Sequence, residues 1–136
     1  MYKLILTILL GALVILPHTQ KFSVFNGYKQ AKRISVSATC YYPDPNQCWG
    51  DIYETASMAR INPDNPIGHR WIAISRDLKE HLKFGDWVFV TGTGVYDGYW
   101  QVQDVMNKRF KLKIDFLVNH DSYLNHWKDV EIILSE

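Results

Sequence analysis

The sequence predicts an all-β domain, a closed barrel of about six short strands with one or two brief helices. Short segments in which apolar residues occupy every second position recur along the chain, which is typical of half-buried strands. Stretches rich in Pro, Gly and Asn separate these segments, and helix-like signals are few and brief. Closure of the strands into a barrel would leave no unpaired sheet edge.

The first predicted strand covers residues 33–41, where apolar residues from Ile34 to Cys40 alternate with polar ones. Pro43 ends this strand. Residues 43–49 and 61–68 are rich in Pro and Asn and are predicted to be loops that could line a cleft.

Residues 71–74 form a short apolar run, after which Ser75 is expected to cap a brief helix that continues to His81. Residues 87–91 and 99–105 are predicted strands of a hairpin, because the turn between them contains several glycines and an Asp-Gly pair. A short helix capped by Asp121 or Ser122 and a strand over residues 130–134 close the predicted domain.

The strand predicted over residues 110–116 has two different faces. Apolar residues occupy one face and polar residues the other, namely Phe110, Leu112, Ile114 and Phe116 against Lys111, Lys113 and Asp115. Since successive side chains of a strand point to opposite sides, Asp115 is expected to project from the barrel wall and not into the core.

The N-terminal segment predicts export. Residues 4–16 are apolar and span about 20 Å as a helix, which is shorter than the roughly 30 Å hydrocarbon layer of a membrane. A signal peptide over residues 1–20 is therefore favoured over an uncleaved N-terminal signal anchor, which would be the only membrane contact. Residues 21–32 are a predicted linker, and residues 33–136 are the predicted barrel domain, which is expected to be a monomer.

Composition excludes some functions. The formal net charge is +1, which gives no general electrostatic attraction for nucleic acid. Cys40 and Cys48 are the only two cysteines, and in an exported chain such a close pair predicts a disulfide, with two unlinked thiols as the alternative. No metal site or cofactor is predicted, because no further Cys exists and no His lies at ligand spacing from this pair.

Two carboxylates, Asp104 and Asp115, lie in otherwise apolar strands. A tight turn at residues 107–108 could pair these strands and bring the two groups together. Like charges held close raise the pKa of one group, so that a carboxylic acid stays protonated near neutral pH and can donate its proton. The alternative for each residue is a solvated surface carboxylate.

Several short motifs occur in a fixed order along the chain: Ala38-Thr39-Cys40-Tyr41, Gln47-Cys48-Trp49-Gly50, Thr55-Ala56-Ser57, Ile72-Ala73-Ile74, Phe84-Gly85-Asp86, the segment from Trp100 to Asp104, and Ile114-Asp115-Phe116. This ordered set resembles the three-aspartate domain family over about residues 37–134. Asp104 lies 11 residues before Asp115, which matches the spacing of the last two aspartates of that family.

The resemblance implies a double-psi β-barrel, the fold of the C-terminal region of membrane-bound lytic transglycosylase A; rare lipoprotein A and expansins share the broader barrel. It also implies that Asp115 is the catalytic acid, supported by Asp104, and that the substrate is the peptidoglycan glycan strand, cleaved between N-acetylmuramic acid and N-acetylglucosamine. A hydrolase that uses water as acceptor is a further option.

Five residues are candidates for substrate binding. Aromatic rings pack well against sugar faces, although each such residue could instead belong to the core or its rim. His120 follows the Asp115 strand and could face the same cleft. The candidates are Thr55, Tyr41, Trp49, Trp100 and His120.

A second hypothesis is a non-catalytic, expansin-like module that binds glycan. Three departures from the family pattern motivate it. Met58 stands where the family has Gly, Ser75 stands where its first aspartate is expected, with Asp77 as the nearest substitute, and Val105 interrupts an Asp-Thr-Gly-Gly-like turn.

Overall fold

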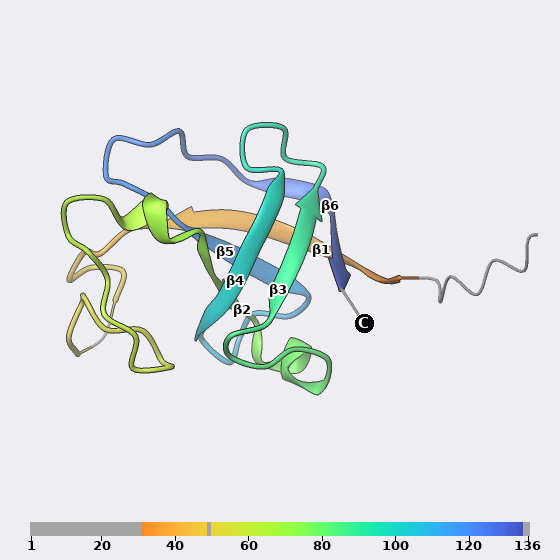
Figure 1. Ribbon diagram of the computed structural model, residues 1–136, viewed down its shortest axis with the longest axis horizontal. Helices are drawn as coiled ribbons and strands as arrows, with labels where there is room; N and C mark the ends of the chain where they lie inside the picture. The colour runs from red at the N-terminus through yellow and green to blue at the C-terminus, as the bar shows by residue number, and fades with distance from the viewer. Residues whose placement is uncertain (1–30, 49, 135–136) are drawn as a thin grey trace, which may run out of the picture.

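The computed structural model describes residues 31–48 and 50–134 and confirms the all-β fold (Figure 1). The predicted signal segment, nearly all of the predicted linker, and Trp49 lie outside the described residues. Six strands form a closed barrel, and two 3-10 helices lie in its connections. The elements are β1 (Lys32–Tyr41), η1 (Pro66–His69), β2 (Trp71–Ile74), η2 (Arg76–Glu80), β3 (Trp87–Thr91), β4 (Gly98–Val105), β5 (Lys113–Leu117) and β6 (Trp127–Leu134).

The strands follow the order β1-β5-β2-β4-β3-β6 around the barrel. The pairs β1–β5 and β2–β4 are parallel, and the other four pairs are antiparallel. Exchanging β1, β2 and β3 for β4, β5 and β6 reproduces every neighbouring pair and its direction. The chain therefore consists of two interlocked halves, which is the arrangement expected of a double-psi barrel.

Alternation along the strands separates an inner core from a smaller apolar layer outside the wall. Fully buried residues such as Trp100, Phe116 and Ile72 fill the barrel. We call the second layer the outer cluster; it consists of Tyr41, Ile61, Ala73, Met106 and Leu117. The outer cluster packs the connections that follow β1 and β4 against the barrel wall.

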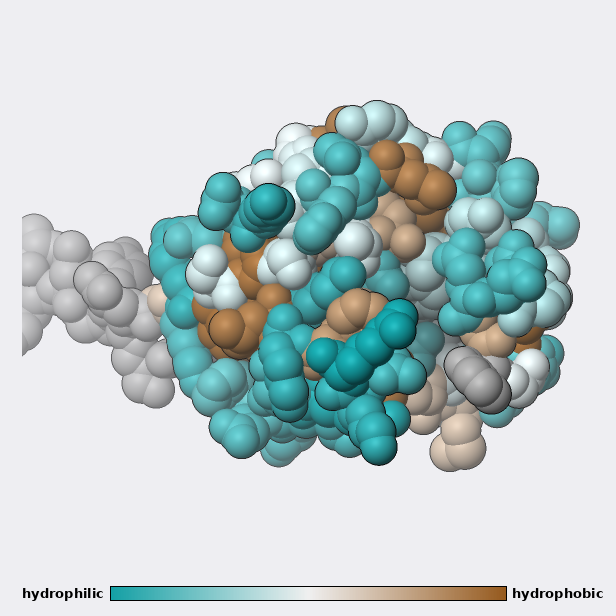
Figure 2. All heavy atoms as spheres, turned by 180° about the vertical axis from the view of Figure 1, so that it is seen from behind, coloured by the Kyte–Doolittle hydropathy of each residue, from teal (hydrophilic) through white to brown (hydrophobic). Residues whose placement is uncertain are grey.

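The long connection between β1 and β2 extends to the left in Figure 1, away from the end of the barrel where β6 ends. Figure 2 shows the molecule from behind the view of Figure 1, and this face is mostly hydrophilic, with hydrophobic residues in small separate areas. Among the described residues, no helix has both the length and the apolar character needed to cross a membrane.

Three local predictions differ from the structure. β5 begins at Lys113 and not at residue 110, because Leu112 has a φ of 41° and is half-exposed. The predicted brief helix is present as η2, with Ser75 as its N-cap residue, but the Ser75 side chain makes no capping hydrogen bond and its hydroxyl accepts from the Lys113 N–H at 3.0 Å. Asp121 and Ser122 lie in a turn rather than at the start of a helix.

Candidate active site

An open cleft of about 970 Å³ lies between the β1–β2 connection and the β4–β5 loop. Both predicted carboxylates line it, together with Tyr41 and Thr55. The topology explains why they meet, because the two connections occupy equivalent places in the two interlocked halves. The cleft is therefore a candidate active site.

Asp115 lies on the floor of the cleft. Its neighbours along β5, Ile114 and Phe116, are fully buried in the barrel core, so the Asp115 side chain points out of the wall, as predicted. β1 and β2 flank it, with Thr39 and Ala73 as its register partners. The carboxyl thus stands in the middle of three adjacent strands.

The surroundings of Asp115 favour its protonated form. Burial raises the pKa of this carboxyl to about 6, whereas the hydrogen bond from Thr39 and the charge of Lys113 oppose the shift. The Thr39 hydroxyl donates to Oδ1 at 2.8 Å, and this is the only hydrogen bond to the carboxyl from a described residue. Oδ2 is therefore available to a ligand in the cleft.

The charge of Asp104, which was the predicted cause of a raised pKa, does raise the pKa of Asp115. It is, however, the smallest of the contributions, and burial is the largest. The two carboxylates are also not on adjacent strands, because β2 lies between β4 and β5. Ala73 is the register partner of both residues, which places the two Cα atoms about two strand spacings, roughly 10 Å, apart.

Asp104 has a different environment, in which both of its carboxylate oxygens are engaged. The Tyr41 hydroxyl donates to Oδ2 at 3.1 Å. The backbone N–H groups of Ala56 and Val105 each donate to Oδ1 at 2.9 Å. Asp104 is therefore held in one orientation by three donors, while Asp115 is held by one.

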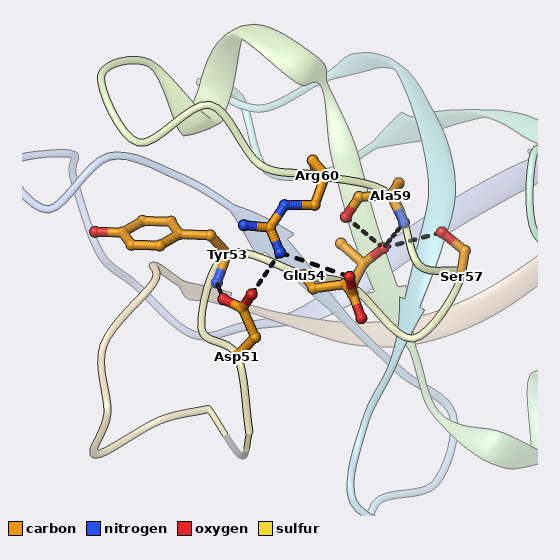
Figure 3. A network of polar contacts seen from close by, with 7 residues as sticks. Asp51, Tyr53, Glu54, Ser57, Ala59 and Arg60 are labelled. Carbon is orange, nitrogen blue, oxygen red and sulfur yellow. Dashed lines mark hydrogen bonds and ion pairs between the residues drawn. The ribbon is translucent and has the colours of Figure 1, made fainter.

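The loop over residues 51–60 forms one wall of the cleft and is stabilised by its own polar network (Figure 3). Arg60 forms ion pairs with Asp51 and with Glu54, the latter at 3.5 Å. The Thr55 hydroxyl is hydrogen-bonded to the Ser57 hydroxyl at 2.9 Å and accepts from the Ala59 N–H at 3.2 Å. These contacts give the wall a defined shape.

Met58 lies at the turn of this loop with a φ of 67°, a backbone conformation that favours glycine. The resemblance places a glycine at this position. Its side chain is 77% exposed, so the loop keeps the turn at the cost of local strain and without a steric clash in the core.

The predicted binding residues separate into those near the cleft and those away from it. Tyr41 and Thr55 line it, but Tyr41 is largely buried in the outer cluster and the Thr55 hydroxyl is occupied within its loop. His120 packs edge-on against Tyr42, with ring centroids 4.9 Å apart, and is not among the cleft-lining residues. Trp49 lies outside the described residues.

Trp100, a predicted binding residue, does not line the cleft. It is completely buried inside the barrel, where its indole N–H donates to the Tyr96 carbonyl at 2.7 Å. The Arg70 guanidinium covers its ring at 3.7 Å from the ring centroid. Stacking on a sugar would require the barrel to open.

The disulfide predicted between Cys40 and Cys48 is not formed, and both cysteines are free. Cys40 packs against the barrel core, whereas Cys48 packs against the outer cluster on the other side of the wall. Burial raises the pKa of both thiols, that of Cys40 to about 11. They are therefore protonated at neutral pH, as suits packing residues.

Asp77, the nearest substitute for the first family aspartate, is not among the cleft-lining residues and accepts a hydrogen bond from the Leu112 N–H at 2.9 Å. It supports the entry into β5. Two exposed arginines that sequence reasoning did not select, Arg76 and Arg109, line the cleft. Only their nearness in sequence to Ser75 and to the turn at residues 107–108 could have indicated them.

Comparison with known proteins gives no indication of function. No protein-family model matches the sequence, and no curated protein matches it. Within the described part of the chain, no cluster of three or more His, Cys, Asp or Glu side chains could hold a metal ion. The resemblance to the three-aspartate family stays a prediction, and the geometry of Asp115 carries the chemistry.

Proposed function

We propose that the protein cleaves peptidoglycan glycan strands as a lytic transglycosylase, with Asp115 as the single acid and base. The observation that carries the proposal is the position of Asp115 at the floor of an open cleft. Its carboxyl is buried enough to raise the pKa to about 6, and Oδ2 has no hydrogen bond from a described residue. A substrate in the cell wall also agrees with the export predicted from residues 1–20.

The proposed reaction needs one carboxyl group. Protonated Asp115 donates its proton to the oxygen between N-acetylmuramic acid and N-acetylglucosamine, and the bond from the muramoyl C1 to that oxygen breaks. The Asp115 carboxylate then removes the proton of the muramoyl 6-hydroxyl, whose oxygen bonds to C1 and closes a 1,6-anhydro ring. The proton lost in the first step returns in the second, so no water is consumed.

The engagement of Asp104 supports a mechanism with a single acid. Most glycoside hydrolases use two carboxyl groups, one of which acts as nucleophile or activates water. Both oxygens of Asp104 are already bonded to protein donors, whereas one oxygen of Asp115 faces the cleft without such a partner. Of the two groups, Asp115 is the one that is free to exchange a proton with a substrate.

Cleavage is expected to decline as the pH rises through about 6, because the pKa of Asp115 is raised to about 6 and the first step needs its protonated form. Above this pH, kcat/KM should fall roughly tenfold for each pH unit. The measurement is initial release of soluble muropeptides across pH 4 to 9. A rate that stays constant from pH 6 to 9 would contradict a role for Asp115 as the acid.

Digestion of purified sacculi with the full-length protein, followed by mass spectrometry, tests the reaction type. The proposal predicts muropeptides that end in a 1,6-anhydro sugar. Products heavier by one water would indicate a hydrolase instead. Binding to sacculi without release of soluble products would favour the glycan-binding module, for which the strained turn at Met58 in the cleft wall is the supporting observation.

A further inference from the structure

The loop that walls the cleft is attached to the barrel at one short stretch of β4. The Ala56 N–H donates to Asp104 Oδ1 at 2.9 Å, and the Ser57 N–H donates to the Gln103 carbonyl at 3.2 Å. The Ser57 hydroxyl donates to Gln103 Oε1. Three hydrogen bonds thus join residues 56–57 to two consecutive residues of β4.

A β-bulge creates this attachment. Ile72 is the register partner of Val102, but Ala73 is the partner of Asp104, so Gln103 is an extra residue in β4. Without the bulge, Asp104 would share the inward face of Trp100 and Val102, which are fully buried in the core. The bulge turns Asp104 outward to the cleft and leaves the Gln103 carbonyl free to accept from Ser57.

We propose that Asp104 is a positioning residue and not a second catalytic group: together with the bulged Gln103, it fastens residues 55–57 in the wall of the cleft and so limits the exposure of Asp115 to water. This inference deepens the proposed function. It rests on that function only where it links the attachment of the loop to proton donation by Asp115. The attachment itself is a property of the fold that can be measured without substrate.

The shielding links the attachment to the chemistry of the site. Thr55 and Ala56 line the same cleft as Asp115, so release of this segment would widen the cleft and expose its floor to more water. Burial is the largest cause of the raised pKa of Asp115. Loss of the attachment should therefore move the pKa of Asp115 down, toward the ordinary value of a carboxyl group.

Replacement of Asp104 by Asn and by Ala separates positioning from charge. Asn keeps an acceptor oxygen for the two backbone donors of Ala56 and Val105, and its amide group can donate to the Tyr41 hydroxyl. Ala removes all three bonds. Gln103→Ala and Ser57→Ala each remove the hydroxyl bond to Gln103 without touching Asp104, and they serve as independent variants should Asp104→Ala fail to fold.

The test uses the full-length protein without substrate, with hydrogen exchange of the Ala56 and Ser57 amides and titration of the Asp115 carboxyl, both followed by NMR. Asp104→Ala is expected to speed exchange at these amides roughly tenfold or more, as for the loss of one hydrogen bond, and to lower the pKa of Asp115. Asp104→Asn should retain most of the protection and lower that pKa only slightly, through the lost charge. Ser57→Ala and Gln103→Ala should show the same effects as Asp104→Ala in weaker form.

Two results would overturn the inference. Equal effects of Asn and Ala at position 104 would show that its charge, and not its hydrogen bonds, matters. The second result is unchanged amide exchange and an unchanged Asp115 pKa in Asp104→Ala, which would show that the loop needs no attachment here. If Asp104→Ala does not fold, the same result in Ser57→Ala and Gln103→Ala would show this. Neither result depends on cleavage of sacculi, so a failure of the proposed reaction is recognised separately.

Discussion

Replacing Asp115 by Asn is expected to reduce the release of muropeptides from sacculi by roughly 10²- to 10⁴-fold, because an amide can neither donate nor accept the transferred proton. Asn can still accept the hydrogen bond from Thr39, so the fold should be retained. The matched control is Asp129→Asn, which changes an exposed strand carboxylate on β6. Full activity of Asp115→Asn would exclude the proposed mechanism.

The same substitution is expected to stabilise the protein at pH 7. Because folding raises the pKa of Asp115 from 3.8 to about 6, the contribution of this carboxyl to stability is fully present below pH 4, and about 2 to 3 kcal/mol of it is lost as the pH rises through 6. Asn does not ionise, so the variant should exceed the wild type by about this amount at pH 7 and by almost nothing at pH 4. Urea denaturation at both pH values measures the difference, and a less stable variant at pH 7 would contradict the burial of the carboxyl.

The Trp100→Ala variant is expected to lose about 3 to 5 kcal/mol of unfolding free energy, because it leaves a large cavity in the centre of the barrel. Trp100 is fully buried and packs against Tyr96 and Phe116, with ring centroids 6.1 and 4.7 Å away. Trp87 on β3 is 47% exposed and provides the control, for which Ala should cost about 1 kcal/mol or less.

Urea denaturation followed by circular dichroism compares the two tryptophan variants. A large loss for Trp100→Ala and a small one for Trp87→Ala would agree with the structure. A stable Trp100→Ala protein that binds sacculi more weakly would instead restore Trp100 to the sugar-binding role that its aromatic character suggested.

Much of the barrel could be predicted from local alternation. The period of two in β1 and around β5 places Ala38 and Ile114 inside and Asp115 outside, and the glycine-rich turn predicts the β3–β4 hairpin. These features depend on neighbours in sequence. They are confirmed because one buried face fixes the direction of every side chain in a strand.

The pairing of distant strands could not be predicted in this way. β4 and β5 are consecutive in sequence, which suggested a hairpin that would bring Asp104 beside Asp115, but β2 lies between them. β4 and β5 each pair with β2, which is farther from them in sequence than they are from each other. No pattern within residues 98–117 encodes that insertion.

Two other errors concern the side of the barrel wall on which a residue lies. Cys40 and Cys48 are close in sequence, yet they pack on opposite sides of the barrel wall. The bulge at Gln103 reverses the alternation in β4 and turns Asp104 out of the core. The origin of the Asp115 pKa shift also needed the structure, because burial, and not the charge of Asp104, is its largest cause.

Titration of the Asp115 carboxyl carbon by NMR in the full-length protein tests most directly the claim on which the function depends. The structure predicts a midpoint at about pH 6, with the group largely protonated at pH 5. A midpoint near the ordinary aspartate value of 3.8 would show a hydrated carboxylate at the cleft floor. That result would contradict the assignment of Asp115 as the proton donor.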